Sequence, residues 1–247
     1  MHKPLQAIGV TCEYVLYDYL IHLPYFAVRT LLAPALYLFA FGLGVGTLTR
    51  YGGNTYFEYV FPGILMITVM QVSYTHFSSE LWISRQVDKY LELLMMVAPI
   101  YPLEAVAGYL IAGIFISLFA VGCFLVMAYL VIGSSSVSLG WLIGFSAGLG
   151  VFFTSLGIIS GISHTNPHHF TTTGTLILLP LSFLCGIFFP LELYPKAVRC
   201  FIELVPLTQA VEGLRSSSPL RHLLYVWGVA LFTAIVSARI FHRKIVS

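Results

Sequence analysis

Long apolar runs alternate with short polar segments along most of this chain. A helix needs about 20 apolar residues to cross the roughly 30 Å of hydrocarbon in a bilayer. Each span must be helical, because lipid offers no partner for unpaired backbone groups and the alternation of a barrel strand is absent. The pattern predicts six membrane-spanning helices, at residues 30–49, 59–79, 109–132, 141–163, 173–189 and 222–241.

The segment before the first span, about residues 5–29, mixes many aromatic residues with Glu13, Asp18 and Arg29. This mixture predicts a helix that lies in the membrane interface rather than a seventh span. Pro24 is expected to kink or end that helix. An ordinary N-terminal lead-in is the alternative interpretation.

A second mixed segment, residues 82–97, follows the second span. Apolar residues recur there at helical spacing, and charged residues populate the other side. The apolar set is Trp82, Ile83, Val87, Leu91 and Leu94, and the charged set is Arg85, Asp88, Lys89 and Glu92. The pattern predicts a short amphipathic helix that ends at Pro99 and Pro102.

The composition identifies the class of protein. Of the 247 residues, 58% are hydrophobic and only 9% are charged, whereas soluble domains carry about 25% charged residues. We therefore expect an all-α integral membrane protein that forms a single transmembrane domain over residues 1–247. The net charge of +2 suggests no nucleic-acid partner. The basic C-terminal end, with Arg239, Arg243 and Lys244, favours a multi-pass topology with both termini in the cytoplasm.

The residue types that the predicted spans and loops lack are informative about mechanism. The predicted spans 109–132, 141–163 and 173–189 contain no Asp, Glu, Lys, Arg or His, which argues against a proton- or ion-coupled transporter. None of the lysines follows Gly and precedes Ser or Thr, as a phosphate-binding loop requires. If transport is driven by ATP, the ATPase must be a separate polypeptide.

The loop HTNPHHF, residues 164–170, contains His164, His168 and His169. Neutral imidazoles bind metals, but no carboxylate or cysteine stands nearby in the sequence, so we interpret the loop as a solvated turn and expect no metal site. The alternative is a membrane-embedded lipid-modifying enzyme that uses these histidines with Glu80 or Glu104.

Few polar groups are placed where they can face a pathway. The candidates are Gln71 and Tyr74, together with the aromatic residues Tyr37 and Phe41, in the first two spans. Aromatic rings with a few hydrogen-bonding groups suit an amphiphile, whereas an inorganic ion needs rings of carbonyls or charges. The same residues can equally face lipid or the protein core. Glycines at spacing four, such as Gly157 and Gly161, allow helix backbones to approach closely.

Three stretches together resemble the membrane subunit of the type-2 ABC exporter family. They are FPGILMITVMQVSY at 61–74, SRQVDKYLELLMMVAPIYPLEAVAG at 84–108, and LPLSFLCGIFFPLELYPKAVRCFIELVPLTQAVEGLR at 179–215. The third is the most specific, with its Phe-Phe-Pro turn and terminal Glu-x-x-Arg.

The resemblance implies a bacterial inner-membrane permease that exports an amphiphilic, lipid-linked or drug-like molecule. Two permease subunits, here a homodimer surrounded by membrane lipid, would dock on an ABC ATPase dimer that binds ATP and Mg, so this chain holds no cofactor and no catalytic residue. Residues 82–97 would be the coupling helix, with Arg85, Asp88, Lys89 and Glu92 facing the ATPase. Residues 190–215 would form re-entrant external helices, and Phe188, Phe189 and Pro190 would form an external gate.

Overall fold

The computed structural model describes residues 4–37, 39–40, 50–51, 54–86, 101–132 and 138–246. Its long elements are α1 (Pro4–Ile21), α2 (Leu23–Tyr37), α3 (Tyr56–Gln86), α5 (Pro102–Ile132), α6 (Leu139–Ser163), α7 (Pro167–Leu184) and α10 (Pro219–Val246). Between α7 and α10 lie the 3-10 helix η2 (Leu191–Leu193) and the short helices α8 (Lys196–Glu203) and α9 (Pro206–Arg215). One two-residue antiparallel pair, β1 (Arg50–Tyr51) with β2 (Asn54–Thr55), is the exception to an otherwise helical description of these residues.

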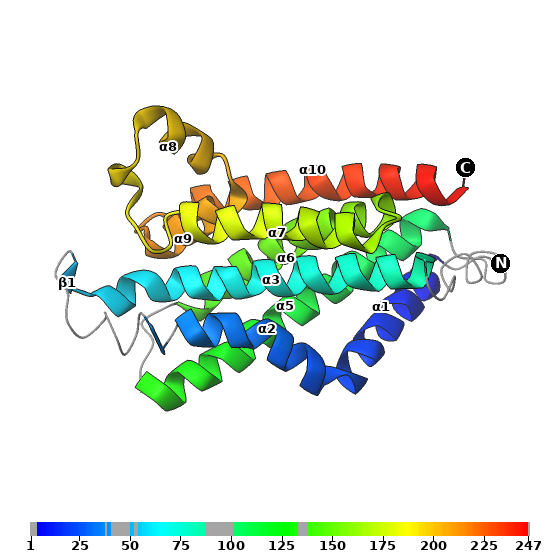
Figure 1. Cartoon of the computed structure of the whole chain (residues 1–247), viewed down its shortest axis with the longest axis horizontal. Helices are drawn as coiled ribbons and strands as arrows, with labels where there is room; N and C mark the ends of the chain where they lie inside the picture. The colour runs from blue at the N-terminus through cyan, green and yellow to red at the C-terminus, as the bar shows by residue number, and fades with distance from the viewer. Residues whose placement is uncertain are drawn as a thin grey trace.

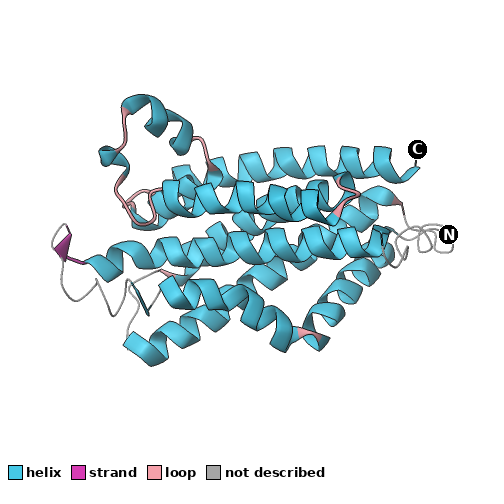
Figure 2. Ribbon diagram, in the orientation of Figure 1, coloured by secondary structure: helices cyan, strands magenta, loops and turns pink. Residues whose placement is uncertain are grey.

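The helices form an elongated bundle in which α3, α5, α6, α7 and α10 extend along the long axis (Figures 1 and 2). Both termini lie at one end of this bundle, which we call the termini end. The opposite end holds α8 and α9, and we call it the α8 end. The predicted placement of both termini on one side of the membrane agrees with this arrangement.

Four of the described helices, α3, α5, α6 and α10, are long and apolar enough to cross a membrane. They contain the predicted spans at 59–79, 109–132, 141–163 and 222–241, and they make the chain consistent with a multi-pass membrane protein. The predicted first span begins inside α2, but residues 38 and 41–49 lie outside the described residues. The six-span division therefore stays a prediction.

Two helix boundaries differ from the predicted ones. Helix α7 ends at Leu184, five residues before the predicted end at 189, because Gly186 adopts a φ of 71° that a continuing helix does not allow. Helix α3 continues to Gln86, so residues 82–86 are its last turn rather than the start of a separate coupling helix. The rest of the predicted coupling helix lies outside the described residues.

Prolines determine where many of the helices begin. Proline is tolerated in the first turn of a helix, where its missing N–H has no partner to lose. Helices α5, α7, α9 and α10 begin at Pro102, Pro167, Pro206 and Pro219. At Pro24 the same rule explains the predicted break: α1 ends at Ile21 and Pro24 is the second residue of α2.

Helices α3 and α6 pack closely in the centre of the bundle, where two glycines of α6 face α3. A Cβ at Gly157 would lie 3.0 Å from the Tyr74 carbonyl oxygen. A Cβ at Gly161 would lie 2.8 Å from the Ser78 carbonyl oxygen and 2.9 Å from the Leu81 Cβ. The predicted role of glycines at spacing four as contact points is therefore confirmed here, within one chain.

Helix α9 is inserted into the core at the α8 end. Its residues Leu207, Ala210 and Val211 are fully buried and belong to the main hydrophobic cluster. By contrast, Val198 and Phe201 of α8 are exposed. The predicted segment 190–215 thus consists of short helices, of which α9 is the one that penetrates the bundle.

Candidate functional site

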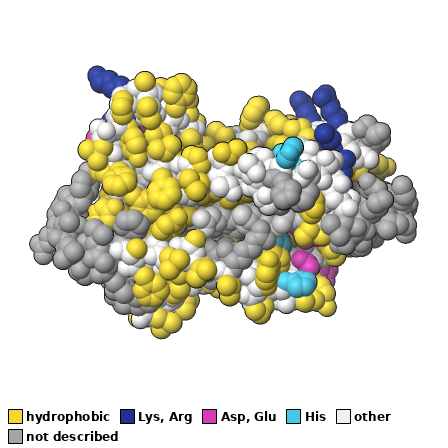
Figure 3. Space-filling model, in the orientation of Figure 1, with side chains coloured by type: hydrophobic (Ala, Val, Ile, Leu, Met, Phe, Trp, Pro, Cys, Tyr) yellow, Lys and Arg dark blue, Asp and Glu magenta, His cyan; other side chains and the backbone are white. Residues whose placement is uncertain are grey.

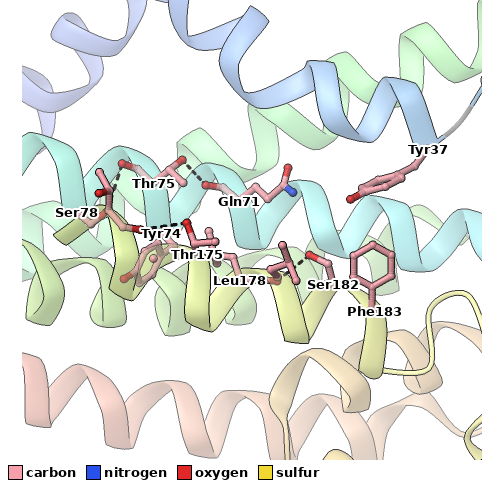
Figure 4. A pocket seen from close by; sticks show the side chains of 12 residues that line it. Tyr37, Gln71, Tyr74, Thr75, Ser78, Thr175, Leu178, Ser182 and Phe183 are labelled. Atoms are coloured by element: carbon pink, nitrogen blue, oxygen red, sulfur yellow. Dashed lines mark hydrogen bonds between the residues drawn. The ribbon is translucent and has the colours of Figure 1, made fainter. Parts of the chain in front are cut away.

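A cavity of about 380 Å³ lies between α2, α3 and α7. This volume is within the range of about 300–1,000 Å³ that small-molecule sites occupy. Figure 4 shows side chains from the three helices turned toward the same space. Its lining consists of Tyr37, Gln71, Tyr74, Thr75, Ser78, Thr171, Gly174, Thr175, Leu178, Leu179, Ser182 and Phe183.

Three of the four predicted pathway residues meet in this cavity. Tyr37 comes from α2, and Gln71 and Tyr74 come from α3. Figure 4 shows the Tyr37 hydroxyl and the Gln71 amide turned toward the same space. Phe41 lies outside the described residues.

The sequence did not lead us to predict that residues of α7 line the cavity. Thr171, Thr175 and Ser182 line it, and their spacing of four and seven residues places them on one face of a helix. That spacing of hydroxyl groups in an apolar run was the available signal. Gly174 lies on the same wall, where a Cβ would be 3.2 Å from the Tyr74 ring.

Phe188 packs against Tyr37 and Phe183, two residues that line the cavity. Its ring packs edge-on against Tyr37, with centroids 5.4 Å apart, and lies 5.7 Å from the ring of Phe183. The side chain is 1% exposed, whereas that of Phe189 is 54% exposed. Pro190 precedes η2 and ends the turn with a φ of −59°. The structure thus separates the three predicted gate residues: one is packed against the cavity, one faces outward and one shapes the turn.

Arg215, at the end of α9, holds the turn that carries Phe188. Its guanidinium donates to the carbonyl oxygens of Tyr59 (2.8 Å), Gly186 (2.7 Å) and Ile187 (3.2 Å), and to the Glu212 carboxylate (3.1 Å). It also stacks on the Tyr59 ring, 3.8 Å from the centroid. We call this arrangement the Arg215 clamp; sequence reasoning missed its geometry.

Two tyrosine hydroxyls tie the same turn to the start of α3. Tyr59 donates to the Gly186 carbonyl at 3.2 Å, and Tyr56 donates to the Phe188 carbonyl at 2.8 Å. With the Arg215 clamp, they give the turn at 186–188 hydrogen bonds from both α3 and α9. The position of Phe188 is therefore determined by residues far apart in the sequence.

At the termini end, Arg85 is the one predicted coupling residue that the structure describes. Its guanidinium donates to the Ile162 carbonyl in the last turn of α6. A cation there also interacts favourably with the negative end of the helix dipole. Arg85 therefore joins the ends of α3 and α6, while Asp88, Lys89 and Glu92 lie outside the described residues.

The histidine loop begins with a helix-joining residue. One ring nitrogen of His164, Nδ1, lies 2.9 Å from the Ser160 carbonyl oxygen, and the other, Nε2, lies 3.1 Å from the Thr173 hydroxyl. These contacts connect the end of α6 to the start of α7. Within the described ranges, no three His, Cys, Asp or Glu side chains group closely enough to hold a metal ion.

Known proteins resemble this chain in sequence. Residues 16–218 match the family model of the ABC-2 type transporter. The chain is 28% identical over 196 residues to the inner membrane transport permease YadH of Escherichia coli K12, covering 76% of this chain and 75% of that protein. YadH of Escherichia coli O157:H7 and of Shigella flexneri match equally. No solved structure matches.

The family match covers most of the chain, including α3, the cavity and the Arg215 clamp. It agrees with the resemblance seen in the three sequence stretches, and it replaces the interpretation of the histidine loop as part of a lipid-modifying enzyme. The chain belongs to the ABC-2 type transporter family, as a membrane permease subunit that is a transport component without a catalytic domain.

Proposed function

We propose that this chain is the permease subunit of an ATP-driven exporter of the bacterial inner membrane. It would move an amphiphilic, lipid-linked or drug-like molecule outward, while a separate ATPase pair binds ATP and Mg. The observation that carries the proposal is the cavity between α2, α3 and α7, where Phe188 packs against the lining residue Tyr37. With both termini in the cytoplasm, the α8 end is the external end, and Phe188 is the external gate.

The position of Arg85 supports this mechanism. Arg85 and the cavity residues Gln71 and Tyr74 lie on the same helix, α3, which is continuous to Gln86. A push from the ATPase on residues 82–97 would therefore move one wall of the cavity directly. The contact of Arg85 with the Ile162 carbonyl would carry the same motion to α6. Asp88, Lys89 and Glu92 would make the contact with the ATPase.

A second copy of the permease would complete the pathway. The α2 and α7 walls of the cavity also carry apolar side chains that are exposed in one chain. They are Leu32, Leu36, Leu176, Leu179 and Phe183. A homodimer formed over this face would bury these side chains and enclose the cavity, and the remaining apolar surface would meet lipid. Figure 3 shows an extensive apolar surface, with Lys and Arg gathered near α8 and near the C-terminal end of α10.

Flux through the reconstituted permease tests the gate. Phe188→Ala should raise ATP-independent leakage of a fluorescent amphiphile from proteoliposomes, because it removes the ring of the proposed gate. Phe189→Ala is the matched control, since its neighbouring ring is exposed, and should leave leakage unchanged. Equal leakage in both variants would contradict the gate.

Copurification and charge reversal test the coupling. Gentle extraction should recover an ATPase with this chain, and Arg85→Glu should reduce transport per ATP hydrolysed while the complex still assembles. If no ATPase copurifies and none stimulates transport, the proposed function is wrong. If coupling is unchanged in Arg85→Glu, Arg85 has no part in it.

A further inference from the structure

Most hydroxyl groups that line the cavity already donate a hydrogen bond to another group of the chain. Such back-bonding to a carbonyl one turn earlier is common for Ser and Thr in helices. The donors and their acceptors are Thr75 with the Gln71 carbonyl, Ser78 with the Thr75 carbonyl, Thr175 with the Thr171 carbonyl, Ser182 with the Leu178 carbonyl, and Tyr74 with the Ser160 hydroxyl.

A hydroxyl that already donates a hydrogen bond can only accept further hydrogen bonds. Each hydroxyl has one proton and two acceptor lone pairs. The walls formed by α3 and α7 therefore offer acceptors to a bound molecule, and Figure 4 shows these side chains from both helices around the cavity. Groups that donate hydrogen bonds fit such a lining, and groups that only accept do not.

Two lining groups retain protons of their own. Neither the Tyr37 hydroxyl nor the Gln71 side-chain amide has a hydrogen bond to another residue in the described part of the chain, and both turn toward the cavity. The amide both donates and accepts. An alcohol group also does both, whereas an ammonium group only donates.

The lining is uncharged: none of the described residues around the cavity is Lys, Arg, Asp, Glu or His. A phosphate or carboxylate would face acceptor oxygens without a cation, and an ammonium ion would lose its hydration without a carboxylate; both are costly. We infer that the cavity takes an uncharged, hydroxyl-bearing headgroup of an amphiphile. This inference rests on the proposed function, because it assigns a substrate class to the same cavity.

Photolabelling with four matched amphiphiles tests the inference. Each probe has the same diazirine-tagged decyl chain, and the headgroups are glucoside, permethylated glucoside, phosphate and ammonium. The full chain in phospholipid nanodiscs is labelled, and peptides from α3 and α7 are quantified by mass spectrometry against probe concentration. We expect half-maximal labelling by the glucoside at a concentration at least about tenfold below that of the permethylated probe, because more than one hydrogen bond is lost.

Valine substitutions test whether the hydroxyl oxygens cause the preference for the glucoside. Thr175→Val keeps the shape of the side chain and should weaken glucoside labelling roughly fivefold, the value of one hydrogen bond, without changing labelling by the permethylated probe. Thr233→Val is the matched control, because Thr233 makes the same kind of back-bond, to Val229, on α10 outside the cavity. A thermal shift of each variant in nanodiscs checks that folding is intact.

The outcomes separate this inference from the function on which it rests. Preferred labelling of the cavity peptides by the phosphate or ammonium probe, or equal labelling by the two glucosides, overturns the inference and leaves the transport function standing. Equal weakening of both glucosides by Thr175→Val overturns it too, since the effect would then come from shape. If no probe labels the cavity peptides, the cavity is not the substrate site, and both proposals fail.

Discussion

Replacing Arg215 by Met should release the turn that carries Phe188. The methionine side chain keeps most of the apolar volume and removes every hydrogen bond of the Arg215 clamp. The carbonyls of Tyr59, Gly186 and Ile187 each lose a charged donor. Because the Arg215 side chain is only 14% exposed, water replaces these donors incompletely.

The magnitude follows from the contacts. Hydrogen bonds that involve a charged group contribute about 1.5–3 kcal/mol each, and a cation–π contact contributes about 0.5–2 kcal/mol. The methionine variant recovers the desolvation cost of the guanidinium, which offsets a large part of this sum. We expect a net loss of about 3 kcal/mol in the local stability of the turn, which corresponds to an open fraction on the order of 100-fold larger.

Native Cys185 reports on this opening. It precedes Gly186 directly and is 1% exposed. In a background where Cys12, Cys123 and Cys200 are replaced by Ser, the rate of maleimide modification measures the open fraction of the turn. Arg215→Met should raise this rate on the order of 100-fold. Arg215→Lys should raise the modification rate less, because an ammonium keeps the charge. The rate should still rise, since an ammonium cannot reach three carbonyls as a planar fork.

A control variant separates local release from general loss of stability. Gly161→Ala places a methyl group against α3 in the last turn of α6, at the termini end of the bundle and in a different helix contact from the turn. It should lower the melting temperature without exposing Cys185. If Cys185 reacts no faster in Arg215→Met than in the parent, the clamp does not hold the turn, and the reasoning from these hydrogen bonds is refuted.

Further substitutions test other contacts by thermal unfolding and hydrogen exchange. Gly161→Ala should destabilise the protein by about 1–3 kcal/mol through overpacking. Gly122→Ala should be neutral or slightly stabilising, because a Cβ there meets nothing within 4 Å. Equal melting temperatures of the two variants would contradict the packing argument. Tyr74→Phe should cost about 1 kcal/mol by removing the 3.0 Å bond to Ser160, and an unchanged melting temperature would show that this bond contributes nothing. Gln209→Leu removes bonds to the last residue of α8 and to a histidine of α10, so amide exchange in α8 should accelerate while exchange in α3 stays unchanged.

Hydropathy predicted α3, α5, α6 and α10 because a membrane span is a local property, set by the length and apolarity of one segment. The end of α7 at Leu184 is not local in this sense. The carbonyl of Gly186 is bound by Arg215, 29 residues later, and by Tyr59, 127 residues earlier. A helix end that depends on such distant donors leaves no signal in a window of neighbouring residues.

The cavity shows the same division between local and distant information. Gln71 and Tyr74 were identifiable because polar side chains in an apolar run are conspicuous. The hydroxyls of Thr175 and Ser182 in α7 were not identified, although they have helical spacing, because Thr and Ser satisfy their own protons within the helix and are therefore common in apolar spans. Only the packing of α7 beside α3 shows that these oxygens face a common space.

Adjacent residues with the same side chain have opposite environments at the proposed gate. In sequence, Phe188 and Phe189 are equivalent, and the resemblance to the family assigns both to one role. In the structure, the Tyr56 hydroxyl binds the Phe188 carbonyl, and the Arg215 clamp binds the carbonyls just before it. These bonds orient the backbone so that one ring packs on Tyr37 while the next ring points away. A gate built in this way depends on the turn as much as on the ring, so Arg215→Met and Phe188→Ala should produce the same leakage phenotype, and Phe189→Ala should not.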